Sequence, residues 1–185
     1  MTVARVLART VAVAILVVLA LPLGWKLLTG DFYLTVEGRS MTPTYALGDV
    51  LVVQEPTGRE LDQLGSIVIV AWDPADPGTG ARYVHRVVEP LGDGTAWLQG
   101  DGNPDRDPRP VAQDQVLGTP RLHLAGDVAT VFAFTQSLPG RVLLGGAALV
   151  LLLVPLRRRS ARAAEDGPGQ DHPGPSRTAA EGVPC

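Results

Sequence analysis

Ser40 is the first residue whose type and surroundings suggest chemistry, since it lies in the run GRSMTP at residues 38–43. A serine nucleophile needs an exposed hydroxyl, a neighbouring base and backbone N–H groups directed at the developing oxyanion. A turn shaped by glycine and proline can present a hydroxyl in that way. Most serines in such a run are ordinary turn residues, so Ser40 is a candidate nucleophile only if the chain also supplies a base.

Candidate bases are few. Lysine occurs once, as Lys26, which precedes Ser40 at the end of an apolar run, so a Ser–Lys pair built within the following domain is excluded. The three histidines are His85, His123 and His172. His172 lies in a polar C-terminal segment, whereas the other two lie in strand-like apolar runs, where a single histidine is ordinarily structural. With lysine excluded, a histidine remains as the candidate base for Ser40.

An acidic segment, QGDGNPDRDP at residues 99–108, supplies Asp101 and Asp107. Acidic loops are usually solvated turns, and this one has some likeness to a calcium-binding loop. The EF-hand pattern fails, because Ala112 stands at the twelfth position counted from Asp101, where a bidentate glutamate is required. A carboxylate can instead orient a histidine base and stabilise its charged form, as the third member of a Ser-His-Asp arrangement.

The elements that must position these side chains are short strands joined by turns. Gly, Pro and Asp signals separate strand-like runs at residues 32–36, 50–54, 67–72, 83–88, 96–99 and 116–117. The pattern lacks the long crossover helices that a parallel sheet needs. The sequence therefore predicts a mainly β fold, a compact antiparallel β domain.

Two apolar runs flank this region. The first, Val11–Gly24, follows Arg5 and Arg9, and the second, Val142–Leu156, ends against three arginines at 157–159. We interpret both as membrane anchors, since the first, with its flanks, would cross about 30 Å of hydrocarbon. The positive-inside rule then puts both chain ends in the cytoplasm. A cleaved signal peptide is the alternative for the first run, and buried core helices are the alternative for either run.

Composition excludes several further classes of protein. The 185 residues carry a formal net charge of −3, so the basic character of a dedicated nucleic-acid-binding domain is missing. The single cysteine, Cys185, is the last residue, which excludes an intramolecular disulfide, a thiolate zinc cluster and CxxC redox chemistry. The segment from Ser160 onward is polar and rich in Gly, Pro and Ala, and we expect it to be a disordered tail.

Five sequence blocks, taken in chain order, resemble those of type I signal peptidases. The resemblance covers roughly residues 36–118, and the blocks are GRSMTPT, LGDVLVV, VHRVV, GDGN and the aspartate at position 107. More narrowly, the chain is similar to the ER-type branch of eukaryotes, archaea and some Gram-positive bacteria, in which histidine replaces the lysine base.

This resemblance assigns roles to particular residues. It implies that Ser40 is the nucleophile, His85 the general base and Asp107 the acid that orients the base. Asp101 matches another acidic position of the family, and which of the two carboxylates contacts the histidine stays open. Gly38 stands where many relatives have a serine whose hydroxyl donates to the oxyanion, so the hole here would consist more heavily of backbone N–H groups.

The implied function is that of a membrane-bound serine endopeptidase that cleaves signal peptides from secreted or membrane preproteins. Small residues are expected at the first and third positions before the cut, and no metal or organic cofactor is required. The expected partners are preprotein signal peptides, the lipid bilayer and the secretion machinery, without nucleic acid. The alternatives are a non-catalytic membrane-anchored β scaffold and a dedicated processor of one or a few secreted proteins.

The expected organisation is a multi-pass cell-membrane protein with an extracytoplasmic catalytic domain of signal-peptidase type, flanked by two transmembrane helices. Its successive parts are a cytoplasmic stub with the first anchor at 1–30, the β peptidase domain at 31–135, the second transmembrane helix at 136–157 and a cytoplasmic tail at 158–185.

Overall fold

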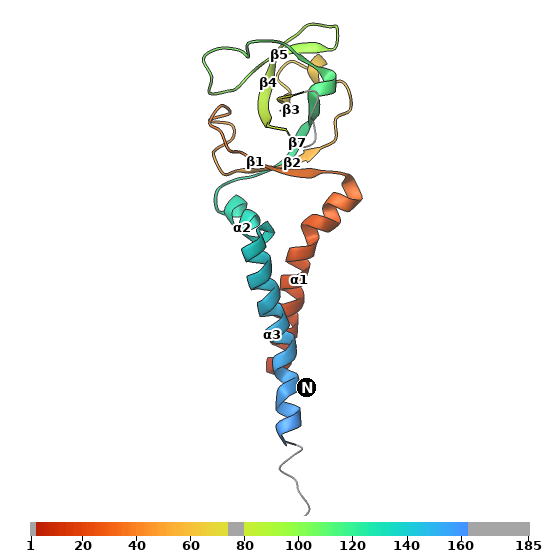
Figure 1. The fold of residues 1–185 in the computed structure, drawn as a ribbon, viewed down its shortest axis with the longest axis vertical. Helices are drawn as coiled ribbons and strands as arrows, with labels where there is room; N and C mark the ends of the chain where they lie inside the picture. The colour runs from red at the N-terminus through yellow and green to blue at the C-terminus, as the bar shows by residue number, and fades with distance from the viewer. Residues whose placement is uncertain (1–2, 74–79, 163–185) are drawn as a thin grey trace, which may run out of the picture.

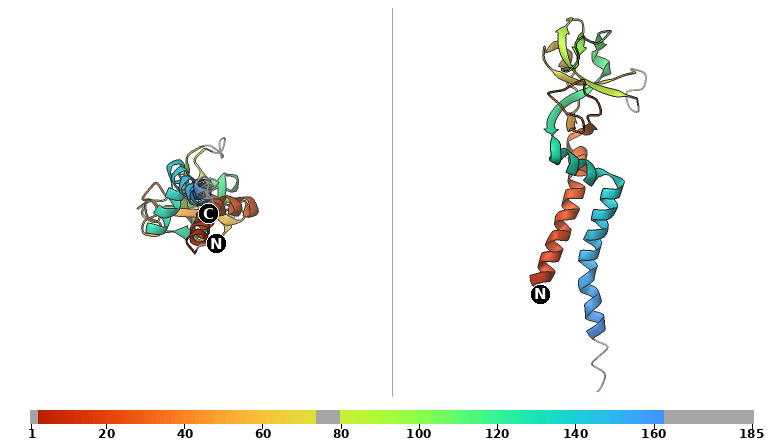
Figure 2. Two further views of the ribbon diagram at one scale, coloured as in Figure 1. Left: turned by 90° about the horizontal axis from the view of Figure 1, so that it is seen from below. Right: turned by 90° about the vertical axis from the view of Figure 1, so that its left-hand side faces the viewer.

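A β domain stands at one end of a pair of long helices. The computed structural model describes residues 3–73 and 80–162, with side chains described up to residue 153. Helix α1 (Val3–Thr29) leads into the β domain, and helices α2 (Gly126–Gln136) and α3 (Leu138–Arg162) lead away from it. Helices α1 and α3 pack against each other below the domain, as the two views in Figure 2 also show.

All strand pairs in the seven-stranded sheet are antiparallel, and the strand order is β1-β2-β7-β3-β4-β5-β6. The strands are β1 (Phe32–Thr35), β2 (Val50–Gln54), β3 (Ile67–Ala71), β4 (Arg82–Pro90), β5 (Thr95–Gln99), β6 (Val111–Ala112) and β7 (Val116–Leu124). Two 3-10 turns, Glu60–Asp62 and Gln113–Gln115, complete the domain. This arrangement confirms the predicted antiparallel, mainly β architecture of the central region.

The central strands are buried because their sequences are rich in β-branched residues on both faces. In β2 the first four residues, Val50–Val53, are all buried, and in β3 the last four are buried. One of the two core clusters packs Leu51, Val53 and Ile69 against Met41 and Tyr45, which come from the loop between β1 and β2. That loop also carries Ser40, so the core fixes the backbone around the candidate nucleophile.

Strand β7 is longer than the sequence pattern predicts, since it continues from residue 117 to Leu124 and pairs with both β2 and β3. Gly118 and Pro120 are residues that usually interrupt strands. Here the register shifts beside Val53, the partner of Pro120, and a Cβ atom on Gly118 would lie 2.1 Å from the carbonyl oxygen of Gln54. The two strands approach so closely at this point that only glycine fits, which explains a residue that looked like a strand ending.

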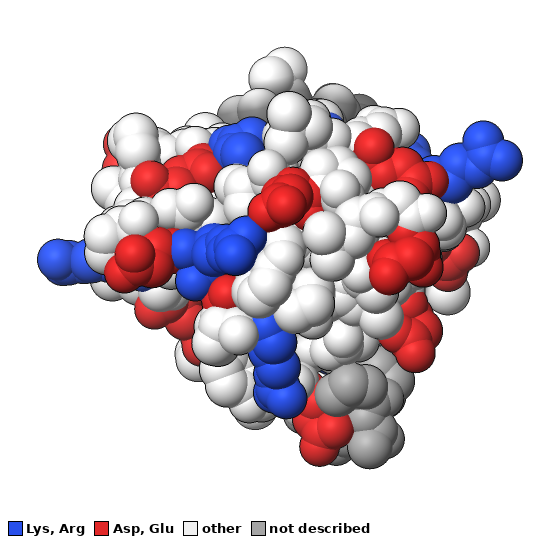
Figure 3. All heavy atoms as spheres, turned by 90° about the horizontal axis from the view of Figure 1, so that it is seen from above, with Lys and Arg blue, Asp and Glu red and all other residues white. Residues whose placement is uncertain are grey.

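Two further elements were not predicted. The two-residue strand β6 pairs with β5 through Val111 and Ala96. Helix α2 begins at Gly126, inside the range 31–135 that was expected to be β domain, and ends one residue beyond it. The face of the domain remote from the helices carries basic and acidic side chains interspersed with each other (Figure 3).

Within the described ranges, α1 is the one helix that is long and apolar enough to cross a membrane by itself. Residues Leu138–Leu153 of α3 are long and apolar enough for a membrane span only when α2 is counted with them. The axes of these two helices differ in direction by 76° at their junction. The expected second anchor at 136–157 is therefore helical over most of its length, but a second span stays a prediction. The expected tail from residue 163 onward, including His172, lies outside the described residues.

A buried carboxylate connects α1 to the sheet. Asp31 is 0% exposed, and its Oδ2 atom accepts a 2.9 Å hydrogen bond from the indole N–H of Trp25. The same oxygen lies 3.4 Å from Nε of Arg121 on β7. The backbone N–H of Asp31 donates to the hydroxyl of Thr29, the last residue of α1. The end of the helix is thus held to the β domain by side-chain contacts as well as by the peptide chain.

Candidate active site

Ser40 lies in a tight turn between β1 and β2. The N–H of Thr42 donates to the carbonyl oxygen of Arg39 at 3.1 Å, and the N–H of Tyr45 donates to that of Met41 at 2.9 Å. Met41 is 2% exposed, so the residue next to Ser40 is anchored in the core, while Ser40 itself is half-buried. The peptide bond between Thr42 and Pro43 is cis. The sequence places a fixed backbone on both sides of the candidate nucleophile.

His85 lies in the middle of β4 and is 8% exposed. Its Nδ1 atom lies 2.8 Å from Oδ1 and 2.9 Å from Oδ2 of Asp107. The backbone N–H of Asp107 in turn donates to the carbonyl oxygen of Leu98 on β5, which fixes the carboxylate against the neighbouring strand. With its Nδ1 proton donated to Asp107, a neutral imidazole carries its lone pair on Nε2. This is the tautomer that a histidine base requires.

Gly100 lies beside both Nε2 of His85 and the Ser40 turn. A Cβ atom built on Gly100 would lie 2.5 Å from the carbonyl oxygen of Ser40 and 2.9 Å from Nε2 of His85. The N–H of Gly102 donates to that same Ser40 carbonyl oxygen at 2.7 Å. The acidic loop therefore packs directly on the serine turn, next to Nε2 of His85.

Ser40, His85 and Asp107 line one cavity of about 450 Å³. Trp72 and Tyr83 form part of its wall, and their rings meet edge to face with centroids 5.8 Å apart. Burial raises the pKa of Tyr83 to about 12, and the negative charge of Asp107 acts in the same direction. The phenol is therefore neutral at physiological pH, and the cavity has an apolar aromatic wall beside a serine, an imidazole and a carboxylate.

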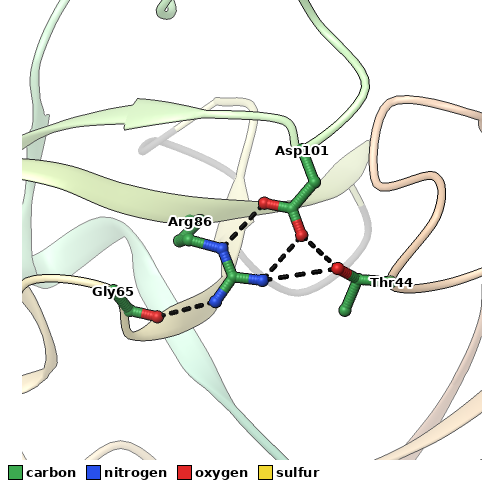
Figure 4. Close-up of polar contacts among 4 residues, drawn as sticks. All are labelled: Thr44, Gly65, Arg86 and Asp101. Carbon is green, nitrogen blue, oxygen red and sulfur yellow. Dashed lines mark hydrogen bonds and ion pairs between the residues drawn. The ribbon is translucent and has the colours of Figure 1, made fainter.

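Asp101 has a different set of partners, shown in Figure 4. Its two oxygens accept hydrogen bonds from Nε and Nη2 of Arg86 at 2.7 and 2.6 Å, and its Oδ2 also accepts from the hydroxyl of Thr44. The remaining Nη1 atom of Arg86 donates to the carbonyl oxygen of Gly65 at 2.9 Å. The sequence left open which carboxylate contacts His85, and in the structure Asp107 makes this contact. Asp101 instead connects the serine loop, through Thr44, to Arg86 on β4, which in turn binds Gly65 just before β3.

Removal of the Asp101 carboxylate should destabilise the protein and disturb the site. The hydrogen bonds from Arg86 hold the pKa of Asp101 below its usual value of 3.8, despite burial, which opposes this. Its contribution is therefore fully present above that pH and is lost as the pH falls through the folded-state pKa. For Asp101→Ala we expect a free energy of unfolding lower by about 2 kcal/mol at pH 7, because the arginine loses its partner.

The measurement is denaturant unfolding of both proteins at pH 7 and again near pH 3. The difference between wild type and Asp101→Ala should shrink at the lower pH, and Asp101→Asn, which keeps one acceptor oxygen, should lie between the two. A difference that is the same at both pH values would contradict the stabilising role of the ionised carboxylate.

His123, the other candidate base, lies outside the cavity that contains Ser40. Its Nε2 atom is 2.6 Å from Oδ2 of Asp49, a carboxylate that also accepts hydrogen bonds from the backbone N–H groups of Ala46 and Gly126. Its ring packs edge to face on Tyr45 with centroids 4.8 Å apart. His123 does not belong to the residues that line the Ser40 cavity. The structure therefore gives it the structural surroundings that a single strand histidine usually has.

A half-buried serine, a histidine and an aspartate line one cavity of an antiparallel β domain, and these are the residue types that serine-peptidase chemistry uses. The chain belongs to the Peptidase S24-like family, whose model matches residues 10–119. This match covers more than half of the chain and includes Ser40, His85, Asp101 and Asp107. Among the curated proteins searched, none matches this chain.

Sequence reasoning missed two kinds of residue at this site. Gly100 and Gly102 provide the space in which the acidic loop meets the serine turn, and Arg86 binds Asp101. The signal was present in the run GDGN, where two glycines flank an aspartate, and in the arginine that directly follows His85. Their roles depend on distances between separate loops, which a linear pattern does not contain.

Substitution of Gly100 by alanine should damage the site more than any other single methyl group added to this loop. The new Cβ would stand 2.5 Å from a backbone oxygen, so the serine turn or the loop must move. A displacement of about 1 Å at reacting groups lowers rates by roughly 100-fold. We expect a loss of that order in kcat for Gly100→Ala, measured by peptide hydrolysis.

The matched control is Gly102→Ala, whose Cβ would be 3.0 Å from the carbonyl oxygens of Arg39 and Thr42. It should lose less activity, because smaller shifts relieve a 3.0 Å contact. Equal activity of wild type and Gly100→Ala would show that the loop does not set the position of Ser40.

Proposed function

We propose that the protein is a membrane-bound serine endopeptidase that cleaves signal peptides from preproteins emerging across the membrane. The observation that carries the proposal is the contact of His85 with Asp107 beside Ser40, in a cavity of a β domain that is attached to a long apolar helix. Membership of the S24-like family supports serine-peptidase chemistry. The signal-peptide substrate and the membrane location rest on the resemblance of the sequence blocks and on the apolar segments.

In the proposed reaction, Ser40 Oγ attacks the carbonyl carbon of the scissile peptide bond as its proton passes to Nε2 of His85. The imidazolium is stabilised by Asp107 and then gives this proton to the leaving amine as the C–N bond breaks. Water attacks the resulting ester with its proton passing again to His85, which releases the carboxylic acid and restores the hydroxyl of Ser40.

Negative charge on the substrate oxygen has to be stabilised during both attacks. A Cβ atom built on Gly38 would lie 4.0 Å from Ser40 Oγ, so residue 38 stands beside the nucleophile but carries no hydroxyl. We assign the oxyanion hole chiefly to backbone N–H groups of the serine turn, including that of Ser40. The rigid packing of Met41 in the core would hold these groups in place before the substrate arrives.

The proposed substrate binds in an extended conformation and adds a strand to an exposed edge of the β domain. Small residues at the first and third positions before the cut would fit shallow pockets beside Ser40. The experiment that tests the function is incubation of the full chain, purified in detergent, with a synthetic preprotein. Cleavage at a single site after a small residue is expected. A preprotein that stays intact would contradict the peptidase proposal and favour the non-catalytic scaffold.

The proposed topology is a multi-pass arrangement with residues 31–135 outside and both termini in the cytoplasm. A reporter inserted at Gly94, in the turn between β4 and β5, should therefore read as extracytoplasmic, and one fused after Leu156 should read as cytoplasmic. Paired reporter fusions in whole cells measure both positions. A reporter after Leu156 that reads as extracytoplasmic would remove the second span from the proposal.

A further inference from the structure

A second cavity, of about 480 Å³, lies where the helices meet the β domain. It is formed by α1, by β1 and β2, and by the junction of α2 and α3. Part of its wall is apolar, with Leu23 and Phe132, and part carries hydroxyl or amide groups, with Thr35, Gln136 and Ser137. Its size is within the usual range of small-ligand sites.

The charged side chains lining this cavity are Lys26 from α1 and Arg141 from α3, and no carboxylate is among the lining residues. Neither cation forms an ion pair within the described part of the chain. The guanidinium of Arg141 donates a 2.8 Å hydrogen bond from Nη2 to the amide oxygen of Gln136, which restrains it beside the cavity. Two positive charges from different helices thus line one space without a negative partner.

Both cations also occupy equivalent places relative to the apolar segments. Lys26 follows the first apolar run by two residues, and Arg141 directly precedes the second. The two helices run in opposite directions, so both residues mark the end of the helix pair that faces the β domain (Figure 1). In the proposed topology this is the translocated side, where cations are disfavoured by the positive-inside bias. A pair of them at that level calls for an anionic partner.

We propose that this cavity binds the phosphate group of an anionic phospholipid from the leaflet next to the β domain. Lys26 and Arg141 would hold the phosphodiester, the amide and hydroxyl groups would bind a polyol headgroup, and Leu23 and Phe132 would contact the glycerol and upper acyl region. The inference rests on the membrane anchoring in the proposed function. It adds a specific lipid to that function, bound at a place remote from Ser40.

The test uses the full chain in bilayer nanodiscs of phosphatidylcholine with a minor fraction of phosphatidylglycerol, followed by release into detergent and native mass spectrometry. The measured quantity is the ratio of bound phosphatidylglycerol to bound phosphatidylcholine. A basic residue near an anionic lipid contributes a factor of roughly five in affinity, so the double variant Lys26→Gln/Arg141→Gln should lower the ratio by about 30-fold. The charge-conserving variant Lys26→Arg should retain it.

Arg9→Gln is the matched control, because it removes one cation from the opposite end of α1. Because Arg9 does not line the cavity, its replacement should lower the ratio by no more than the roughly fivefold effect of one surface cation, well short of the effect of the double variant. Soluble glycerol phosphate, added in excess, distinguishes the two sources of a phosphate group: weak competition supports a lipid site, and complete displacement of the lipid would show a site for free phosphate and overturn the proposal. An unchanged ratio in the double variant would overturn it as well.

The result of the lipid-binding test can be distinguished from the result of the preprotein-cleavage test. Cleavage of a preprotein in detergent involves neither cation, so the double variant should cut at the wild-type rate. If the wild type binds phosphatidylglycerol selectively but cleaves nothing, the peptidase proposal fails and the lipid site stands. If the chain is washed from nanodiscs at alkaline pH, the anchoring fails and the lipid site with it.

Discussion

Ser40→Ala is expected to abolish cleavage of the synthetic preprotein, with a loss of at least about 10⁴-fold in kcat/KM. The reason is that both bond-making steps pass through the Ser40 oxygen, which no neighbouring group replaces. The fold should be unaffected, because Ser40 is half-buried and its hydroxyl forms no hydrogen bond with the residues that the structure describes. We expect a free energy of unfolding within about 0.5 kcal/mol of wild type.

Ser66→Ala is the matched control for this variant. Ser66 is likewise a half-buried serine outside the strands, but it lines a different cavity from that of Ser40. Its replacement should leave the rate within about twofold of wild type. Cleavage is followed by mass spectrometry of both product fragments, so that the cut site is identified as well as the rate. Normal cleavage at the same site by Ser40→Ala would end the serine-peptidase interpretation.

His85→Ala should lose activity to a similar extent, about 10⁴-fold, because the proton of Ser40 then has no acceptor. His123→Ala should keep most of its activity, although it removes the partner of Asp49 and so destabilises the loop around Tyr45. The comparison is informative because both histidines lie on strands and each contacts one aspartate. Only one of them lines the cavity that contains Ser40.

The wild-type rate should also fall as the pH is lowered, since an imidazolium cannot accept the proton of Ser40. Replacement of Asp107 by alanine should lower the rate, because the imidazole of His85 then loses the carboxylate that orients it. Near-normal cleavage by His85→Ala together with inactivity of His123→Ala would reverse the assignment of the base within the same class of enzyme.

Much of the fold could be predicted because local sequence and local structure agree. Five of the six predicted strand-like runs match observed strands closely, since β-branched residues are bounded there by Gly, Pro or Asp. The sixth run was too short, because the pairing of β7 with two partners overrides the signal of Gly118 and Pro120. Helix α2 has no strong amphipathic pattern, so the sequence offered no periodicity from which to predict it.

The candidate site was predictable in its residue types but not in its contacts. The order of motifs indicated Ser40, His85 and two aspartates, yet the spacing of six residues between Asp101 and Asp107 does not determine which of them reaches the imidazole. The loop turns back on itself between the two, so that Asp107 faces His85 while Asp101 is taken by Arg86. Such a choice depends on three-dimensional packing of the loop against β4 and β5.

The contact of Asp31 with Trp25 and Arg121 has a consequence for the proposed function, because it joins the first helix to the sheet. A carboxylate that is 0% exposed and bonded to both α1 and β7 leaves the β domain little freedom to swivel on its first helix. With the proposed anchoring, Ser40 would therefore stand at a constant height above the bilayer. The protein would act as a molecular ruler, in which the distance from the lipid surface, as well as the residues beside the scissile bond, selects where a preprotein is cut.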